Sequence, residues 1–154
     1  MRLPIAAVLA LAFASSIGAQ TSPALTDLST AIPTPGNWSY APTADGSEAV
    51  FTNATGYPQL WVHCTRATRR VSFARPATSA TPLLNVWTSS AIRAVPSSYN
   101  PATRHLTIEL AGSDPFLDSV ATSRSRLGFS VGSEPALVVP AWAEVARVIE
   151  DCRA

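Results

Sequence analysis

The chain has 154 residues, of which 47% are hydrophobic and 14% charged, with 13 prolines, 7 glycines and 2 cysteines. This composition excludes disordered, collagen-like and disulfide-dense classes of protein and predicts one ordinary globular domain. All 11 basic residues are arginines, against 10 acidic residues, and a net charge of +1 does not indicate nucleic acid or an anionic membrane as a partner.

Residues 1–19 have the layout of a cleavable signal peptide. A positive charge at Arg2 is followed by an uninterrupted apolar run over 5–13 and then by mostly small residues. This run is shorter than the roughly 18 residues that span a bilayer, so we expect cleavage and no membrane span in the mature protein. We predict cleavage after Ala19, with Ala14 as the alternative, and a periplasmic or secreted product.

Two regions follow the signal peptide. Residues 20–36 are rich in Pro, Ser and Thr and predict an arm or linker, while residues 37–154 form the domain. In the domain, short alternating segments are separated by turn residues every 8 to 12 positions or so, which is typical of antiparallel β-structure. The predicted strands cover 38–41, 48–52, 60–66, 70–75, 83–89, 91–95, 105–111, 127–131 and 136–139. The predicted turns contain Asp45-Gly46, Thr55-Gly56, Arg75-Pro76, residues 96–101 and Gly132-Ser133.

Alternation along the strands assigns side chains to faces. Cys64 falls on the core side of the strand 60–66, and Trp61 falls on the opposite side. Trp87 also falls on an outward or second face. A helix over that face is the interpretation we favour. If both rings are exposed instead, they form a partner contact or a platform on which carbohydrate stacks.

Two helices are predicted near the end of the chain. Asp114 is the N-cap of a short helix that ends near Ser123, because Pro115 follows it at the first helical position. The second helix opens at Pro140 and carries four apolar residues on one face, namely Trp142, Val145, Ile149 and Cys152. We expect Trp142 and its neighbours to pack this helix on the sheet, because about twelve isolated residues form only a marginal helix.

The two cysteines predict one disulfide. An exported chain favours bond formation, and Cys64 and Cys152 allow only one pairing. Both lie on inward faces, so the bond ties the last helix to the sheet. It closes a loop of 88 residues, for which chain entropy predicts a stabilisation of roughly 4 to 5 kcal/mol.

No catalytic, metal or cofactor site is predicted. The two histidines, His63 and His105, lack partners at metal-ligand spacing, and Cys64 points to the face opposite His63. There is no Gly-x-Ser-x-Gly elbow and no glycine-rich phosphate loop. Asp114 and Asp118 are explained by helix capping and a first-turn charge. A histidine within reach of both a serine and a carboxylate in a cleft would favour an enzyme instead.

Charge is distributed unevenly along the chain. Residues 61–104 hold six arginines and no acid, while seven acids follow from 105 onward. We favour pairing of the two halves across the fold over a dipolar surface that steers an acidic partner. Three of the arginines, Arg66, Arg69 and Arg70, lie at a predicted hairpin tip and are candidate contacts for a carboxylate or phosphate of a partner.

Several landmarks together resemble a known family. These are the Trp38 strand, the Leu60-x-Val62-x-Cys64 strand, the Phe116-Leu117 helix, the Phe129 strand, and the final Ile149-Glu150-Asp151-Cys152-Arg153. They resemble VasI-type accessory proteins of type VI secretion, and residues 114–153 are also similar to exported proteins of alphaproteobacteria. The resemblance implies a periplasmic β-sandwich with a disulfide-tied terminal helix, no cofactor and no catalytic residue. The chain departs from the pattern in its long Ser/Pro/Thr-containing stretch over 78–100.

The sequence therefore predicts a mainly β domain, either an antiparallel sandwich or a partly open barrel, with a short internal helix and a disulfide-tied C-terminal helix. The expected function is that of a non-enzymatic, exported accessory or binding protein of the cell envelope that contacts other proteins. The alternative is a small periplasmic hydrolase or hydrolase inhibitor.

Overall fold

The computed structural model describes residues 30–132 and 134–154. The predicted signal peptide over 1–19, its cleavage after Ala19 and the beginning of the predicted arm lie outside these residues. No helix in the described ranges has the length and apolar character needed to cross a membrane.

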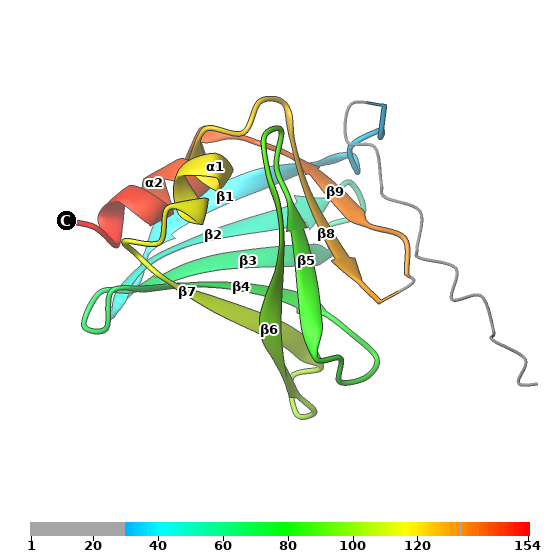
Figure 1. Cartoon of the computed structure of the whole chain (residues 1–154), viewed down its shortest axis with the longest axis horizontal. Helices are drawn as coiled ribbons and strands as arrows, with labels where there is room; N and C mark the ends of the chain where they lie inside the picture. The colour runs from blue at the N-terminus through cyan, green and yellow to red at the C-terminus, as the bar shows by residue number, and fades with distance from the viewer. Residues whose placement is uncertain (1–29, 133) are drawn as a thin grey trace, which may run out of the picture.

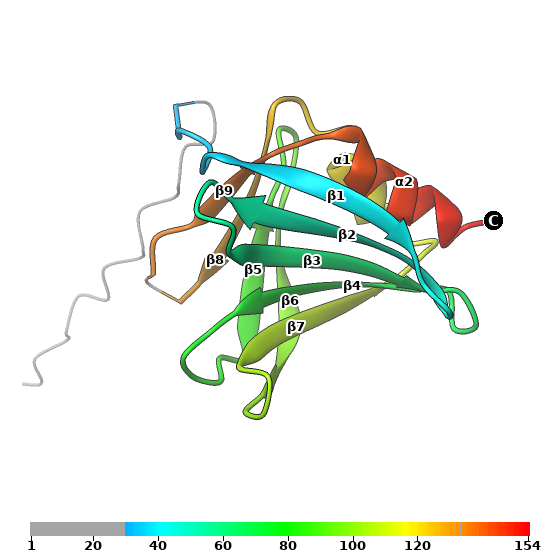
Figure 2. The ribbon, with the colours of Figure 1, turned by 180° about the vertical axis from the view of Figure 1, so that it is seen from behind.

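The domain is built on one antiparallel sheet with the strand order β1-β2-β3-β4-β7-β6-β5-β8-β9. Its strands are Gly36–Pro42 (β1), Gly46–Asn53 (β2), Pro58–Thr65 (β3), Arg70–Pro76 (β4), Leu83–Trp87 (β5), Ile92–Asn100 (β6), His105–Ala111 (β7), Arg126–Val131 (β8) and Leu137–Pro140 (β9). The sheet curls into a half-barrel, with β1 to β4 on one side and β5 and β8 on the other (Figures 1 and 2). The mainly β class is confirmed, and the partly open barrel describes the architecture better than a sandwich.

Two helices, Phe116–Ala121 (α1) and Ala143–Asp151 (α2), lie together at one end of the half-barrel (Figure 1). The alternation predicted for the strands is observed: Leu60, Val62 and Cys64 are buried and pack in one core with the apolar side chains of both helices. The helices therefore cover the inner face of the sheet. The outer face, which carries Trp61, is not covered by either of them.

The two edge strands approach each other and nearly close the barrel. The backbone N–H of Thr34 donates to the carbonyl of Val138 at 2.7 Å, and the indole Nε1 of Trp38 donates to the carbonyl of Pro140 at 2.8 Å. These bonds replace a regular strand ladder between β1 and β9. They also attach the end of the predicted arm, residues 30–36, to the domain.

Two of the predicted turns are wrong, because in the structure their prolines lie inside strands. The strand β4 runs through Pro76, and β6 runs through Pro96 to Asn100. The first half of β6 pairs with β5 and the second half with β7, so the sheet changes partner near Pro96. Proline has no N–H to donate and is tolerated where a strand bends or a ladder bond is not needed.

The predicted disulfide is present between Cys64 on β3 and Cys152 just after α2, with a Cα–Cα distance of 5.4 Å. The buried face of α2 consists of Val145, Val148 and Ile149. The expectation that Trp142 packs on the sheet is wrong. The helix begins at Ala143, three residues after the predicted start at Pro140, so Trp142 has an extended backbone and its side chain is 44% exposed.

Candidate functional site

Four connections that are distant in sequence surround a cavity of about 540 Å³ on the outer side of the sheet. They are the β2–β3, β4–β5 and β6–β7 turns and the segment after β8. Hairpins of an antiparallel sheet alternate between its ends, so these turns gather at one end. The cavity is lined by Tyr57, Pro58, Trp61, Pro76, Ala77, Thr78, Thr103, Arg104, His105 and Glu134.

The aromatic base of the cavity is formed by Trp61 and His105. Their ring centroids lie 4.4 Å apart with an angle of 38° between the planes. Trp61 on β3 is directly opposite Ala74 on β4, so a small side chain separates it from β7, where His105 begins the strand. Both residues are half-buried and keep part of their surface open to the cavity.

The first wall is the β2–β3 turn, which presents Tyr57. The side-chain oxygen of Asn53 accepts hydrogen bonds from the backbone N–H of Thr55 at 3.1 Å and of Tyr57 at 2.9 Å. Asn side chains commonly organise turns in this way. The backbone of Tyr57 is thereby fixed while its side chain is 61% exposed at the rim.

The second wall is the β6–β7 turn, which presents Arg104. Asn100 Oδ1 accepts from the backbone N–H of Ala102 at 2.9 Å, and Arg104 has a positive φ of 56°. The carbonyl of Arg104 accepts from Ala77 N–H at 2.9 Å, which joins this turn to the β4–β5 connection. A left-handed conformation is unfavourable for a residue with a Cβ, so the turn holds Arg104 at some cost in stability.

A second guanidinium and a carboxylate lie at the same end. Arg75 faces the inner side of the sheet, and its Nη1 donates to the Phe129 carbonyl at 2.8 Å. Burial lowers the pKa of the Arg75 guanidinium, and the negative charge of Glu134 opposes this effect. Arginine stays charged under such conditions, so Glu134 has a cationic neighbour outside the cavity lining.

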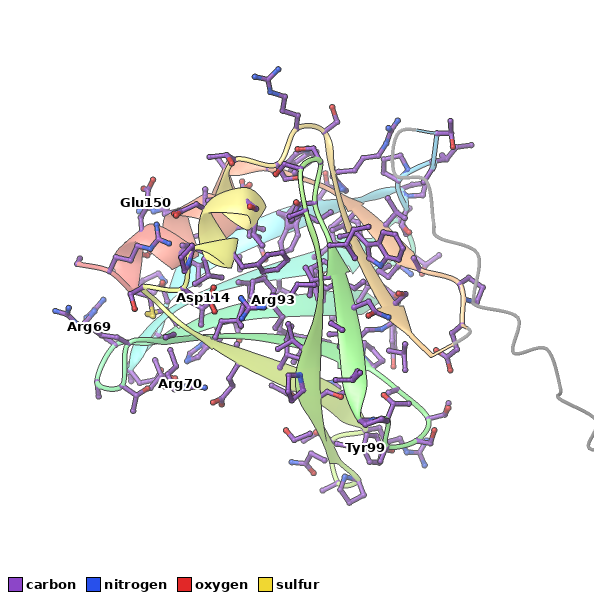
Figure 3. The ribbon with its side chains drawn as sticks, in the orientation of Figure 1. Arg69, Arg70, Arg93, Tyr99, Asp114 and Glu150 are labelled. Atoms are coloured by element: carbon purple, nitrogen blue, oxygen red, sulfur yellow. A yellow bond between two sulfur atoms is a disulfide. The ribbon has the colours of Figure 1, made fainter. Side chains whose placement is uncertain are left out.

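The five predicted contact residues do not come together. Trp61 lines the cavity, while Arg66, Arg69 and Arg70 lie at the β3–β4 turn, at the opposite end of β3. Figure 3 shows Arg69 and Arg70 near α2 and Tyr99, close to the β6–β7 turn, at the far end of the molecule. Arg70 Nε donates to Glu109 Oε2 at 3.0 Å, so its charge is already partnered.

Trp87 lies neither at the cavity nor at the β3–β4 turn. It lies on β5, is 6% exposed, and donates from Nε1 to Ser130 Oγ at 3.0 Å. The expected cover of this ring is confirmed, since its side chain is buried. A platform made of Trp61 and Trp87 is therefore wrong, since one of the two rings is buried.

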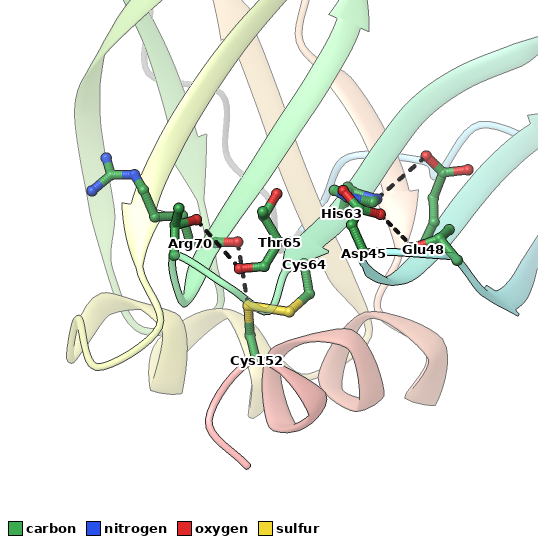
Figure 4. Close-up of polar contacts among 9 residues, drawn as sticks. Asp45, Glu48, His63, Cys64, Thr65, Arg70 and Cys152 are labelled. Carbon is green, nitrogen blue, oxygen red and sulfur yellow. Dashed lines mark hydrogen bonds and ion pairs between the residues drawn. A yellow bond between two sulfur atoms is a disulfide. The ribbon is translucent and has the colours of Figure 1, made fainter.

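His63 lies between two carboxylates on the outer face (Figure 4). Its Nε2 is 3.1 Å from Asp45 Oδ2, and its Nδ1 is 3.9 Å from Glu48 Oε2. Hydrogen bonds from Thr43 and His63 lower the pKa of Asp45. Ser72 is opposite His63 on β4, but within the described ranges no hydrogen bond joins them, and both imidazole nitrogens face carboxylates.

An exposed apolar strip lies on the outer face of β5 and β6. Leu83 and Ile92, which are 44% and 54% exposed, face outward together with Pro96 opposite Leu83. No acidic or basic residue occurs over 78–92. Apolar surface of this kind is typical of contact regions in proteins that bind other proteins.

Sequence reasoning did not identify Tyr57, Arg104 or Glu134 as site residues. One signal was present: Ala-Thr-Arg occurs twice, at 67–69 and 102–104, each time before a strand. The third residue of both copies, Arg69 and Arg104, has a positive φ, of 50° and 56°. The repeat marks two equivalent turns, of which only the second borders the cavity.

Comparisons with protein-family models, with curated proteins and with solved structures find no match to this chain. The resemblance to VasI-type proteins stays a prediction.

Proposed function

We propose that this protein is a non-enzymatic, exported accessory protein of the cell envelope that binds a partner protein at the Trp61–His105 cavity. The observation that carries the proposal is the cavity itself. It exposes two aromatic side chains, together with an arginine whose guanidinium has no partner among the described residues, beside turns that are fixed by Asn53 and Asn100.

The rigid frame supports a binding role. The cavity is formed by turns of one continuous sheet, and that sheet is cross-linked to α2 by the Cys64–Cys152 bond. A preorganised surface loses little entropy when it binds. A disulfide is also consistent with an oxidising compartment, which supports the proposed export.

The surroundings of the histidines support a non-enzymatic role. A general base must reach the proton that it removes, and the nitrogens of His63 already face Asp45 and Glu48. His105 is in contact with the Trp61 ring. The hydrolase alternative depends on Ser72, which is opposite His63 on the neighbouring strand.

The proposal is tested by photo-crosslinking in the native cells. A benzoylphenylalanine replaces Tyr57, which is 61% exposed at the rim of the cavity, and adducts are identified by mass spectrometry. We expect one envelope protein to be cross-linked. The matched control carries the same group at Trp142, which is 44% exposed just before α2, and should not capture that protein.

Two results would overturn the proposal. The first is the absence of a protein adduct at position 57, or the same adducts at positions 57 and 142. The second is covalent labelling of Ser72 by a serine-directed fluorophosphonate, which would favour the hydrolase alternative.

A further inference from the structure

Two of the lining side chains whose polar groups have no partner among the described residues can only donate hydrogen bonds. The indole N–H of Trp61, the hydroxyl of Tyr57 and the guanidinium of Arg104 make no hydrogen bond in the described part of the chain. Arginine and the indole N–H are donors only. A ligand that fits these groups must therefore be rich in acceptors.

The apolar part of the cavity lining further restricts the chemical class of the ligand. Pro58, Pro76 and Ala77 line the cavity together with Trp61, so much of the lining is apolar. Proline-containing segments in the polyproline II conformation have flat rings and free carbonyls, and proline itself has no N–H. They characteristically bind in grooves lined by aromatic side chains. A neutral sugar, in contrast, presents donors and acceptors in similar number.

The charged side chains around the cavity indicate which charge the ligand carries. Arg104 is exposed and has no carboxylate partner among the described residues. Glu134 is the acidic residue in the lining, and Arg75 lies close enough to interact with its charge. No ion pair joins Arg104 to Glu134 among the described residues, so the exposed Arg104 guanidinium stays available to a carboxylate of the ligand.

We infer that the cavity binds an acidic, proline-containing segment of the partner protein, with a proline ring on Trp61 and a carboxylate on Arg104. This inference rests on the proposed function and specifies the chemistry of the partner. The volume of about 540 Å³ is within the range of sites that enclose a small ligand, so a few residues of the segment fill it.

Peptide titration of the oxidised protein tests the inference, with isothermal titration calorimetry as the readout, which does not depend on the Trp61 ring. The probe is acetyl-Pro-Pro-Asp-Pro-Pro-amide, and the comparison peptide has Asn in place of Asp. We expect the Asp peptide to bind about fivefold more tightly, as for a solvent-exposed ion pair. Trp61→Leu should weaken both peptides by at least about tenfold.

The two equivalent turns provide a matched pair of variants. Arg104→Gly and Arg69→Gly each place glycine at a positive φ, which glycine adopts without strain, so neither should lower the unfolding midpoint. Arg104→Gly should abolish the preference for the Asp peptide. Arg69→Gly should retain it, because Arg69 lies at the opposite end of the sheet.

Equal affinity of the wild-type protein for the two peptides would overturn the inference, as would loss of the preference in both glycine variants. Binding of glucuronate without binding of either peptide would assign the site to an acidic saccharide and would also overturn it. If neither peptide binds but the group at position 57 still captures a partner, the proposed function stands and only the peptide chemistry fails.

Discussion

At the scale of single residues, Asp114 connects a strand to a helix. Its Oδ1 accepts the backbone N–H of Phe116 at 2.9 Å, and Arg93 Nη1 lies 2.7 and 2.8 Å from its two oxygens. Figure 3 shows Arg93 and Asp114 directed toward each other beside α1. Burial alone would raise the pKa of this carboxyl, but the Phe116 amide and Arg93 outweigh burial and hold it below its ordinary value.

The ionised form of Asp114 therefore stabilises the fold at pH values above the unfolded pKa of about 4, and this contribution is lost as the pH falls through the lower folded pKa. Asp114→Asn should reduce the free energy of unfolding by about 1 kcal/mol near neutral pH, because the ion pair with Arg93 is lost, and should make stability less sensitive to acid. Urea unfolding at about pH 7 and about pH 3 measures both effects. Asp118→Asn, which affects an exposed pair with Arg153, is the control and should change stability less. Parallel pH profiles for wild type and Asp114→Asn would contradict this account.

The sequence predicted Asp114 as the N-cap because Asp-Pro before apolar residues is a local signal. In the structure α1 begins at Phe116 with Pro115 at the N-cap position, and Asp114 Oδ1 accepts the Phe116 N–H from one residue further back. Its ion pair with Arg93 was not predicted, since that contact depends on where β6 runs. The same limit applies to Arg104. Its charge is visible in the sequence, but its place beside Trp61 depends on which turns gather at one end of the sheet.

At the scale of elements, the C-terminal helix is attached to the sheet by several contacts. Besides the disulfide, Tyr40 donates its hydroxyl to Asp151 Oδ2 at 2.7 Å, and the Arg147 guanidinium lies 3.9 Å from the centroid of the Tyr40 ring. Arg153 Nε donates to the Gly112 carbonyl at 2.7 Å. A Cβ at Gly112 would lie 3.1 Å from the Arg69 carbonyl and 3.2 Å from that of Cys152, so glycine permits this close approach.

Replacing both cysteines, Cys64→Ala with Cys152→Ala, should lower the free energy of unfolding by about 4 kcal/mol, because the open chain gains entropy when it unfolds. Urea unfolding measures this loss, and hydrogen exchange should show faster opening of α2 than of β3 and β4. Wild-type protein treated with a reductant should behave like the double variant. Unchanged stability in both would contradict a structural role for the bond.

The elements were predictable where their signals are local. The strand His105–Ala111 has the predicted bounds because it alternates cleanly, and the buried face of α2 follows its helical period. Pro96 was interpreted as a turn because a proline inside a strand is tolerated only where the sheet bends, and that bend is a property of the whole sheet. Trp142 was predicted to lie on the buried face because the sequence indicates a helix that starts at Pro140, whereas the helix starts at Ala143.

At the scale of the whole molecule, the acid-free and acid-rich parts of the chain pair with each other. Arg70 and Arg93 from the first part lie 3.0 and 2.7 Å from Glu109 and Asp114 of the second. This confirms the pairing expected from the charge distribution. The cavity was not predictable, because its residues come from four connections whose meeting is determined by the strand order.

The predicted export and signal-peptide cleavage are tested on the full-length protein expressed in a bacterium. We expect the periplasmic product to begin at Gln20, because small residues precede the predicted cleavage site, and to contain one intramolecular disulfide. N-terminal sequencing and intact mass measure these properties. Ala19→Arg is the control and should impair cleavage at this position. A product that retains Met1, or one with two free thiols, would contradict the prediction.

The position of the disulfide has a mechanical consequence. The 88-residue loop closed by Cys64 and Cys152 contains everything from β4 to α2, while β1 and β2 lie before it. Tension applied at the amino-terminal side can therefore draw out only the leading strands in the oxidised protein. The chain between the two cysteines could extend by about 300 Å, but only after the disulfide is reduced. A molecule under tension would therefore unfold its first strands while most of the chain stays inside the closed loop.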